Sequence, residues 1–229
     1  MRVGAAGRTA LVAGATGLVG RHVLAALLAD GRHATIHVLL RRDWPPSLAH
    51  VVAGAAGRFV PHLVDFATLA RWTRFPAADD VYSCLGTTIR AAGSQEAFRR
   101  VDFDAVVSIA RLARRRGATR LGVVSAMGAD PSSRVFYNRV KGETEAALAA
   151  LDYPSLTVLR PSLLAGERDE RRPAERAGLL LARGLGSLVP ARWRPVAAAD
   201  VARCLVDAVA RGERGLRIVE SDRIAHPPG

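Results

Sequence analysis

The single lysine of this chain stands four residues after a tyrosine, and such a pair can transfer protons. Lys141 follows Tyr137, and every other position of the Lys/Arg class holds arginine. Positions four apart share one face of a helix, so the phenol and the ammonium would project into the same space. An ammonium is a compact point charge that favours the phenolate form of a neighbouring tyrosine. The spacing therefore predicts a general acid or base, with a surface pair of no function as the alternative.

Three glycines at three-residue spacing predict a phosphate-binding turn near the start of the chain. They come directly after an apolar run and open a helical segment. In that context backbone amides approach a pyrophosphate, the helix N-terminus offers positive potential, and the last glycine permits close helix-to-strand packing. An ordinary tight turn is the alternative. The residues predicted to contact a dinucleotide here are Gly14, Thr16, Gly17, Leu18, Val19 and Gly20.

The end of the second predicted strand indicates which dinucleotide is bound. At this place an acidic residue would accept hydrogen bonds from the ribose of NAD. The chain instead has Arg41 and Arg42 directly after Leu40. Paired guanidiniums bind a 2′-phosphate in bidentate fashion, so NADP(H) is the predicted cofactor. Two alternatives remain: Asp43 turns inward, or both arginines are merely solvated.

Composition predicts one globular domain without a membrane span. The 229 residues are 49% hydrophobic and only 5% aromatic, which suits a single aliphatic core. No apolar run reaches the length of about 18 residues that a spanning helix needs. Cys84 and Cys204 lie far apart and lack metal-ligand spacing. They predict reduced thiols, no metal site and a cytoplasmic location.

The net charge of +12 raises the question of nucleic-acid binding. The arginines are scattered along the chain, and the densest group, which includes residues 114–116, ends a predicted helix where cations complement the macrodipole. No zinc-finger spacing, aromatic RNA-binding strand or helix-turn-helix pattern accompanies them. The sequence therefore predicts no specific nucleic-acid partner.

Short apolar runs alternate with helical segments, which predicts an α/β fold. The expected strands are Thr9 to Ala13, Thr35 to Leu40, Arg58 to Val64, Val81 to Leu85, Leu121 to Ser125 and Leu156 to Leu159. The expected helices are Leu18 to Ala29, Gln95 to Arg116 and Ser133 to Leu151. This order predicts a doubly wound parallel sheet, a Rossmann fold, with its ligand at the carboxyl ends of the strands.

Two stretches interrupt the alternation. Asp43 to Gly57, with its two adjacent prolines, predicts a loop. Residues 161–195 predict a short substrate-side extension of the same domain. Within it we expect an exposed loop from Glu167 to Pro173 and a helix from Ala174 to Arg183 over the cleft. A monomer or a homodimer is expected for such a fold.

The chain resembles the short-chain dehydrogenase/reductase superfamily over nearly its whole length. Besides the glycine turn and the Tyr-x-x-x-Lys pair, Ser125 ends a predicted strand where the family has its catalytic serine. Residues 84–88, 124–130 and 160–162 are most similar to an atypical branch named for a human Tat-interacting protein. That branch has aspartate where the superfamily commonly has a helical asparagine. Asp102 matches this position, with Asp104 as the alternative register.

The resemblance implies roles for these residues. Tyr137 would exchange a proton with the substrate oxygen and Ser125 would hydrogen-bond that oxygen. Lys141 would hold the nicotinamide ribose and favour the phenolate, and Asp102 would replace the relay asparagine. The likeness further implies cofactor contacts from Asp65, Phe66, Leu85, Gly86, Thr87, Pro161 and Leu163.

Three functions are consistent with these residues. The first is an NADP(H)-dependent oxidoreductase that acts on a small carbonyl, hydroxyl or quinone-like substrate. The second is an NADP(H)-binding regulator whose cofactor state alters a protein partner, although an intact Tyr137 and Lys141 pair argues against binding alone. The third is an enzyme like the sugar-nucleotide epimerases and dehydratases, which commonly have a larger carboxyl-terminal substrate domain than this chain offers.

Overall fold

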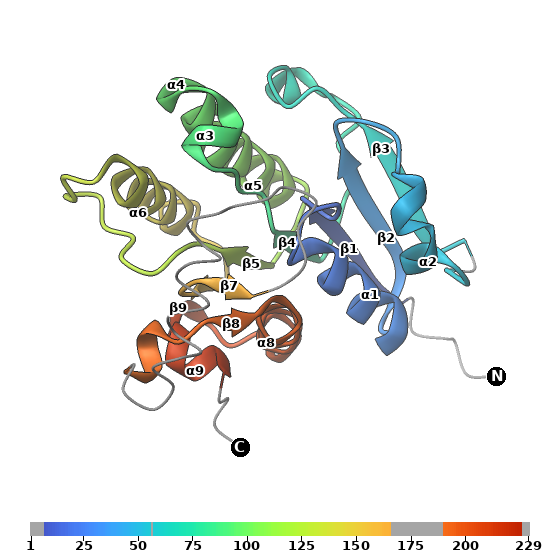
Figure 1. Ribbon diagram of the computed structural model, residues 1–229. Helices are drawn as coiled ribbons and strands as arrows, with labels where there is room; N and C mark the ends of the chain where they lie inside the picture. Colours follow the sequence, from blue (N-terminus) through green and yellow to red (C-terminus); the bar gives the residue numbers. More distant parts are fainter. Residues whose placement is uncertain (1–6, 56, 166–189, 226–229) are drawn as a thin grey trace.

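Seven parallel strands form the centre of the molecule (Figure 1). The computed structural model describes residues 7–55, 57–165 and 190–225. The strands lie in the order β3-β2-β1-β4-β5-β6-β9. Their bounds are β1 Arg8–Ala13, β2 His33–Leu40, β3 Phe59–Leu63, β4 Asp80–Ser83, β5 Arg120–Val124, β6 Ser155–Arg160 and β9 Gly215–Glu220. This is the predicted Rossmann-type sheet, since every pairing along it is parallel.

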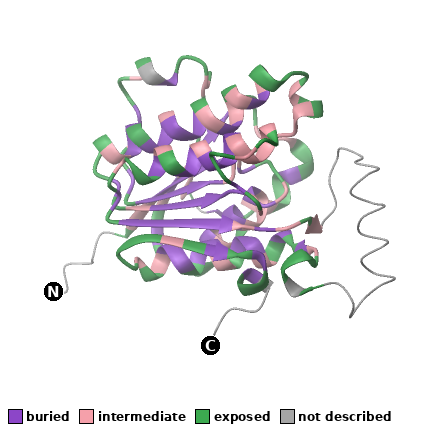
Figure 2. Ribbon diagram, turned by 90° about the vertical axis from the view of Figure 1, so that its left-hand side faces the viewer, coloured by how far each residue is buried: buried purple, intermediate pink, exposed green. Residues whose placement is uncertain are grey.

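Helices cover both faces of the sheet, and the buried residues gather between the layers (Figure 2). One face carries α1, α2 and α8, and the other carries α5 and α6. The α-helices are α1 Gly20–Asp30, α2 Ala49–Val52, α3 Ile89–Ala92, α4 Gln95–Arg99, α5 Val106–Arg115, α6 Phe136–Ala149, α8 Ala198–Arg211 and α9 Ser221–Ala225. The short elements are the 3-10 turns Pro46–Leu48, Leu69–Arg71 and Ala191–Trp193, the π-helical segment Arg100–Ala105, and the strand pair β7 Leu164–Ala165 with β8 Val196–Ala197.

Alternate side chains of one strand enter opposite halves of the core. On β1, Ala10 and Val12 pack with α1 and α8, whereas Leu11 and Ala13 pack with α5. All four are fully buried. This is the period-two pattern of a strand buried on both faces, and it explains why the strand reads as a continuous apolar run.

The order in which strands are added to the sheet changes side between β1 and β4. The chain adds β2 and β3 on one side of β1 and then crosses over to β4, which pairs with the other side of β1. Connections on the two sides therefore leave the carboxyl ends of β1 and β4 in opposite directions. A crevice forms at such a point, and ligands of doubly wound sheets bind there.

The six predicted strands are confirmed, whereas the last strand and the helix before it were not predicted. β9 pairs with β6 over its whole length, Gly215 opposite Ser155 and Glu220 opposite Arg160. Arg217 stands between Leu216 and Ile218, so the segment lacks the continuous apolar run by which the other strands were predicted. The buried valines and leucines of α8 follow a helical period that could have indicated the helix.

Two other predictions need correction. The predicted loop from Asp43 to Gly57 contains a 3-10 turn and the short helix α2. The predicted helix from Gln95 to Arg116 is α4 and α5 with the π-helical segment between them. A π-helical turn has one extra residue, which periodicity cannot reveal and which changes the direction of the side chains that follow. The predicted loop at Glu167 to Pro173 and helix at Ala174 to Arg183 lie outside the described residues.

A buried carboxylate joins three strands at the edge opposite the crevice. Asp80 begins β4, and its two oxygens accept hydrogen bonds from Arg8 at 2.6 and 2.7 Å. His33 of β2 lies 2.9 Å from the same carboxylate. Burial opposes the charge of Asp80, but the hydrogen bonds from His33 and Arg8 hold the pKa of this carboxyl below its ordinary value. The ionised form is therefore the one that the fold binds.

Replacement of this carboxylate tests its contribution. Asp80→Asn should lower the free energy of unfolding at pH 7 by about 3 kcal/mol, because Arg8 loses its buried counter-charge. The folded-state pKa is depressed, so the stabilisation is present above the unfolded-state pKa of about 4. It is lost as pH falls through the folded-state value. Urea unfolding between pH 7 and pH 3 measures both effects, and the loss caused by the variant should shrink at the acidic end.

The exposed Asp104 provides the matched control. Asp104→Asn should change the free energy of unfolding by less than about 0.5 kcal/mol at every pH. An Asp80 variant as stable as the parent at pH 7 would contradict the assignment.

Candidate active site

The turn between β1 and α1 passes very close to the end of β4. Gly14 has a φ of +80°, and a Cβ placed there would lie 2.6 Å from the backbone of Cys84. A Cβ at Gly20 would overlap the carbonyl oxygen of Gly14. Gly14 is therefore required by its backbone conformation and Gly20 by the contact between helix and strand.

Gly17 meets no comparable obstacle. A Cβ there would approach only the carbonyl oxygen of Gly14, at 3.2 Å, and the residue lines the space above the turn. Leu18 and Val19 follow it along the same space. Carbonyl oxygens of the turn accept hydrogen bonds from the amides of Gly17, Arg21, His22 and Val23. The amides of Leu18 and Val19 are therefore the ones that can face a ligand in that space, at the positive end of α1.

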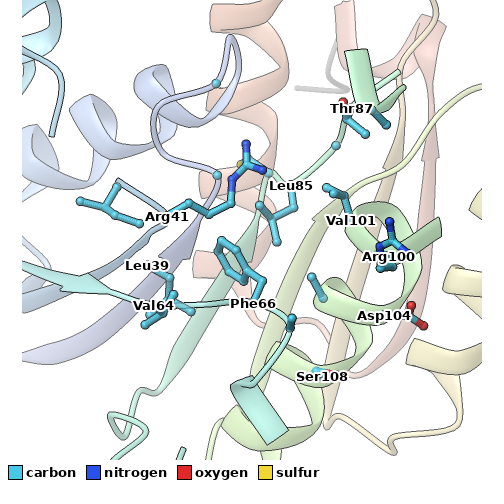
Figure 3. Close-up of a pocket in the computed structure, with 18 of the residues that line it drawn as sticks. Leu39, Arg41, Val64, Phe66, Leu85, Thr87, Arg100, Val101, Asp104 and Ser108 are labelled. Atoms are coloured by element: carbon cyan, nitrogen blue, oxygen red, sulfur yellow. The ribbon is translucent and has the colours of Figure 1, made fainter. Parts of the chain in front are cut away.

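A cavity of about 1030 Å³ extends from the glycine turn along the carboxyl ends of β1, β2 and β4. Figure 3 shows Arg41 and Phe66 on one side, Leu85 near the centre, and Arg100 on the other side. Gly14, Asp65, Gly86 and Thr87, all predicted cofactor contacts, also line it. The opposite wall comes from α3, α4 and the π-helical segment.

The two arginines after β2 differ in position. Arg41 lines the cavity and its side chain extends toward Leu85 (Figure 3), whereas Arg42 is not among the lining residues. Arg100, which sequence analysis did not single out, supplies a second guanidinium on the facing wall and pairs with Glu96 at 2.6 Å. The structure thus separates the predicted pair and leaves Arg41 as the member that faces the cavity.

A second cavity of about 630 Å³ continues the first. Thr16, Gly17 and residues 84–87 line both, so the two form one cleft above the glycine turn. Its far end is lined by predicted catalytic and cofactor-binding residues from three segments, namely Ser125, Tyr137, Lys141, Pro161 and Leu163.

Lys141 forms a buried ion pair at the base of this end. Its Nζ lies 2.7 Å from a carboxylate oxygen of Asp102, and the other oxygen of Asp102 accepts the amide N–H of Thr87 at 2.9 Å. Asp102 is 1% exposed and Lys141 6%. Asp104 is exposed on the same segment. Of the two aspartates considered, Asp102 is therefore the one that meets the lysine.

The charge of Lys141 is stabilised by its neighbours. Burial alone would favour the neutral amine, but the negative charge of Asp102, with a smaller effect of Tyr137, raises the pKa of Lys141 above its ordinary value. Lys141 is therefore a cation at neutral pH. Asp102 also offsets part of the positive field that reaches Tyr137.

The π-helical segment places Asp102 in this position. Asp102 and Thr144 of α6 join the two elements, because the hydroxyl of Thr144 lies 3.0 Å from the carbonyl oxygen of Asp102. The ring of Phe98 packs 5.4 Å from that of Tyr137. These contacts hold α6 against the segment that carries the aspartate.

Ser125 has a partner that the sequence analysis missed. Its hydroxyl donates to Glu145 of α6, and Glu145 also accepts from Arg160 at 2.6 Å. In this geometry the Ser125 proton points to Glu145 instead of into the cleft. Glu145 follows Lys141 by four residues, so the helical spacing that identified Tyr137 and Lys141 could have identified it too.

The remaining reactive side chains near the cleft have ordinary structural roles. Burial raises the pKa of the Cys84 thiol to about 12, which suits a packed side chain and not a nucleophile. Among the described residues no cluster of three or more His, Cys, Asp or Glu could hold a metal. Within the same part of the chain, no helix combines the length and apolar character of a membrane span.

Comparison with known proteins gives a consistent family. The chain matches the NAD(P)H-binding family over residues 14–211. Protein HTATIP2 of Rattus norvegicus is 31% identical over 224 residues, which cover 96% of this chain and 88% of that protein. Protein FMP52, mitochondrial, of Coccidioides immitis is 35% identical over 175 residues, 73% of this chain and 70% of the relative.

Solved structures share the fold. A short-chain dehydrogenase/reductase from Mycobacterium ulcerans superposes with a TM-score of 0.69 at 19% identity, over 95% of this chain and 90% of that one. UDP-glucose 4-epimerase from Thermotoga maritima, solved with UDP-glucose, gives 0.67 at 16% identity over 94% and 77%. These identities are low, so the likeness concerns the fold.

The predicted cytoplasmic location is wrong in light of these relatives. Several of them, from Coccidioides immitis, Emericella nidulans and Eremothecium gossypii, are named as mitochondrial proteins. The prediction rested on two unpaired cysteines. Free thiols indicate a reducing environment but contain no targeting information, so they could not distinguish one reducing compartment from another.

The glycine turn offers a test of the geometry. Gly20→Ala should lower the free energy of unfolding by about 2 kcal/mol or more, because the new methyl group has no room against Gly14. Gly17→Ala should cost less than about 1 kcal/mol, since the contact needs only a small adjustment. Chemical denaturation of both variants measures the difference. Equal losses would show that the packing of the turn has been misread.

Proposed function

Because the chain belongs to the NAD(P)H-binding family, and within it to the atypical short-chain dehydrogenases/reductases related to HTATIP2 and FMP52, we propose that it is an NADP(H)-dependent oxidoreductase. Its substrate would be a small carbonyl, hydroxyl or quinone-like molecule. One observation carries the proposal: Tyr137 and Lys141 line the same cleft as the glycine turn.

The residues along the cleft fit such a cofactor. The amides of Leu18 and Val19 would hold the pyrophosphate, above the turn that the amide of Gly17 closes onto the carbonyl oxygen of Gly14. Arg41 would bind the 2′-phosphate, and Phe66 would border the adenine. Lys141 would bind the nicotinamide ribose, and Pro161 with Leu163 would flank the nicotinamide. Hydride transfer is the chemistry that the cofactor supplies when bound.

Tyr137 is proposed as the group that gives a proton to the substrate oxygen or takes one from it. Lys141 lies one helical turn away and remains charged, because Asp102 stabilises the ammonium. Asp102 in turn is fixed by the amide of Thr87, so the lysine has a defined position. This arrangement supports a proton-transfer role for Tyr137.

The lining of the second cavity favours an uncharged substrate over a sugar nucleotide. Among its described lining residues Lys141 is the one cation, and it is already paired with Asp102. A nucleoside diphosphate group would call for further cationic side chains. Met127, Leu163 and Leu164 contribute an apolar wall instead. The likeness to UDP-glucose 4-epimerase thus supports the fold more than its substrate.

Cofactor choice can be tested with a matched pair of arginines. Arg41→Ala should weaken NADPH binding at least tenfold, about 1.4 kcal/mol, and leave NADH binding within about twofold, because only NADPH has the 2′-phosphate. Arg42→Ala should change neither affinity by more than about twofold, since Arg42 does not line the cavity. Calorimetric titration at fixed salt measures all values. An equal loss for both cofactors would place phosphate recognition elsewhere.

The catalytic role of the tyrosine can be tested in a reductase assay. With 9,10-phenanthrenequinone and NADPH, Tyr137→Phe should lower kcat at least about a hundredfold and leave the Kd for NADPH within a few-fold. Turnover is followed as the loss of NADPH absorbance. Full activity in the variant would exclude Tyr137 as the acid.

The parent protein tests the regulatory alternative. Tight NADPH binding by the parent, without turnover on a panel of carbonyls and quinones, would favour that alternative.

A further inference from the structure

The geometry points to Glu145 as a positioning residue: it accepts a hydrogen bond from the hydroxyl of Ser125, so that Ser125 faces the cleft as a hydrogen-bond acceptor for the phenol of Tyr137. The inference deepens the proposed function, on which its catalytic meaning rests. It differs from the role implied by the family resemblance, in which Ser125 donates a hydrogen bond to the substrate oxygen.

The polarity of the hydrogen bond follows from the partners of Glu145. Arg160 contacts both carboxylate oxygens, with Nη2 at 2.6 Å from Oε2 and Nε at 3.2 Å from each oxygen. A guanidinium only donates and an ionised carboxylate only accepts. Ser125 also contacts Oε1. Between these two groups the serine must be the donor, because a carboxylate held by Arg160 has no proton to give.

The arrangement is buried and fixed from two sides. Glu145 is 9% exposed and Ser125 7%, and both project from elements of the core, α6 and the end of β5. Arg160 ends β6 and also pairs with Glu220 of β9 at 3.2 Å. The hydrogen bond with Glu145 is the main reason that the pKa of Arg160 lies above its ordinary value. Arg160 therefore fixes the position of the carboxylate that accepts the hydrogen bond of Ser125.

A hydroxyl whose proton is already donated has only lone pairs left for other partners. Ser125 and Tyr137 line the same cavity, and the phenol of Tyr137 is the donor that the inference assigns to Ser125. Ser125 then stabilises the protonated tyrosine and orients its oxygen. The proton that reaches a substrate carbonyl comes from Tyr137 alone, without a second hydrogen bond from the serine.

Other charges near the two residues come from neighbouring elements. Tyr137 shares its helix face with Lys141, which pairs with Asp102 of the π-helical segment. Glu145 faces Arg160 of β6, and its charge also reaches Lys141. Any test must therefore separate the hydrogen bond of Ser125 from the electrostatic effect of the Glu145 charge.

Nuclear magnetic resonance of tyrosine labelled with ¹³C at Cζ makes this separation. The chain has three tyrosines, and Tyr137→Phe identifies the signal of Tyr137. Burial raises the pKa of both Tyr82 and Tyr153 far above its ordinary value, so their signals stay unchanged over the range. The measurement is the pH midpoint of the Tyr137 signal, and it needs neither cofactor nor substrate. The titration can therefore still be interpreted if the proposed function is wrong.

Ser125→Ala gives the first result through the sign of the shift. If Ser125 accepts from the phenol, its removal destabilises the protonated form and lowers the midpoint by about one pH unit. If Ser125 donated to the phenolate, removal would raise the midpoint, and the inference would be overturned. An unchanged midpoint would overturn it as well, because the serine would then have no contact with the phenol.

Glu145→Gln gives the second result. Arg160 would hold the amide oxygen, so the amide nitrogen would donate to Ser125 and release the serine proton toward the phenolate. The midpoint should fall by about one pH unit in the parent background and by less than half of that in Ser125→Ala. Equal shifts in both backgrounds would reduce the effect to charge alone and reject the positioning role.

Glu143→Gln is the matched control on the same helix. Glu143 pairs with Arg99 at the surface, away from Ser125, so the variant should leave the midpoint unchanged. Circular dichroism over the same pH range verifies that each variant is folded. Should Glu145→Gln fail to fold, the sign of the Ser125→Ala shift decides the inference by itself.

Discussion

The buried ion pair between Lys141 and Asp102 is the interaction on which the site depends. It joins α6 to the π-helical segment, and through the amide of Thr87 it also holds the chain that leaves β4. Two charges removed from water need each other, because either one alone would be costly to bury. The positions of three separate elements around the cleft are therefore coupled. Tyr137 has a defined neighbour only because the ammonium one turn away is held in place.

A second polar group of side chains lies beside the first without sharing its partners. Ser125, Glu145 and Arg160 connect the end of β5, α6 and the end of β6. Both groups start from one face of α6, where Tyr137, Lys141 and Glu145 follow one another at four-residue intervals. One helix thus presents a phenol and an ammonium to the same end of the cleft and a carboxylate to Ser125, which lines that end. Neighbouring elements determine what each group can do.

The glycine turn contributes to the same cleft by leaving side chains out. Gly14 and Gly20 allow β1, β4 and α1 to approach more closely than any side chain would permit. Gly17 leaves space on the cleft side of the turn. The result is a surface of backbone amides at the reversal point of the sheet, opposite the residues of α6. Gly14 and Gly20 are needed for close packing between backbones, whereas Gly17 leaves space for a ligand, so one short motif uses glycine for two different reasons.

The sequence by itself determined the alternation of strands and helices, the glycine turn, and the pairing of Tyr137 with Lys141. Each of these is local, since it depends on periodicity or on residues within one turn of chain. Only the tertiary structure decided that Asp102 and not Asp104 meets the lysine, and that Arg41 and not Arg42 faces the cavity. It also decided that Glu145 accepts the hydrogen bond of Ser125. The edge strand β9, with its exposed apolar residues, also became visible only through its pairing with β6. These contacts join segments far apart in the chain, and a single extra residue in a π-helical turn is enough to redirect them.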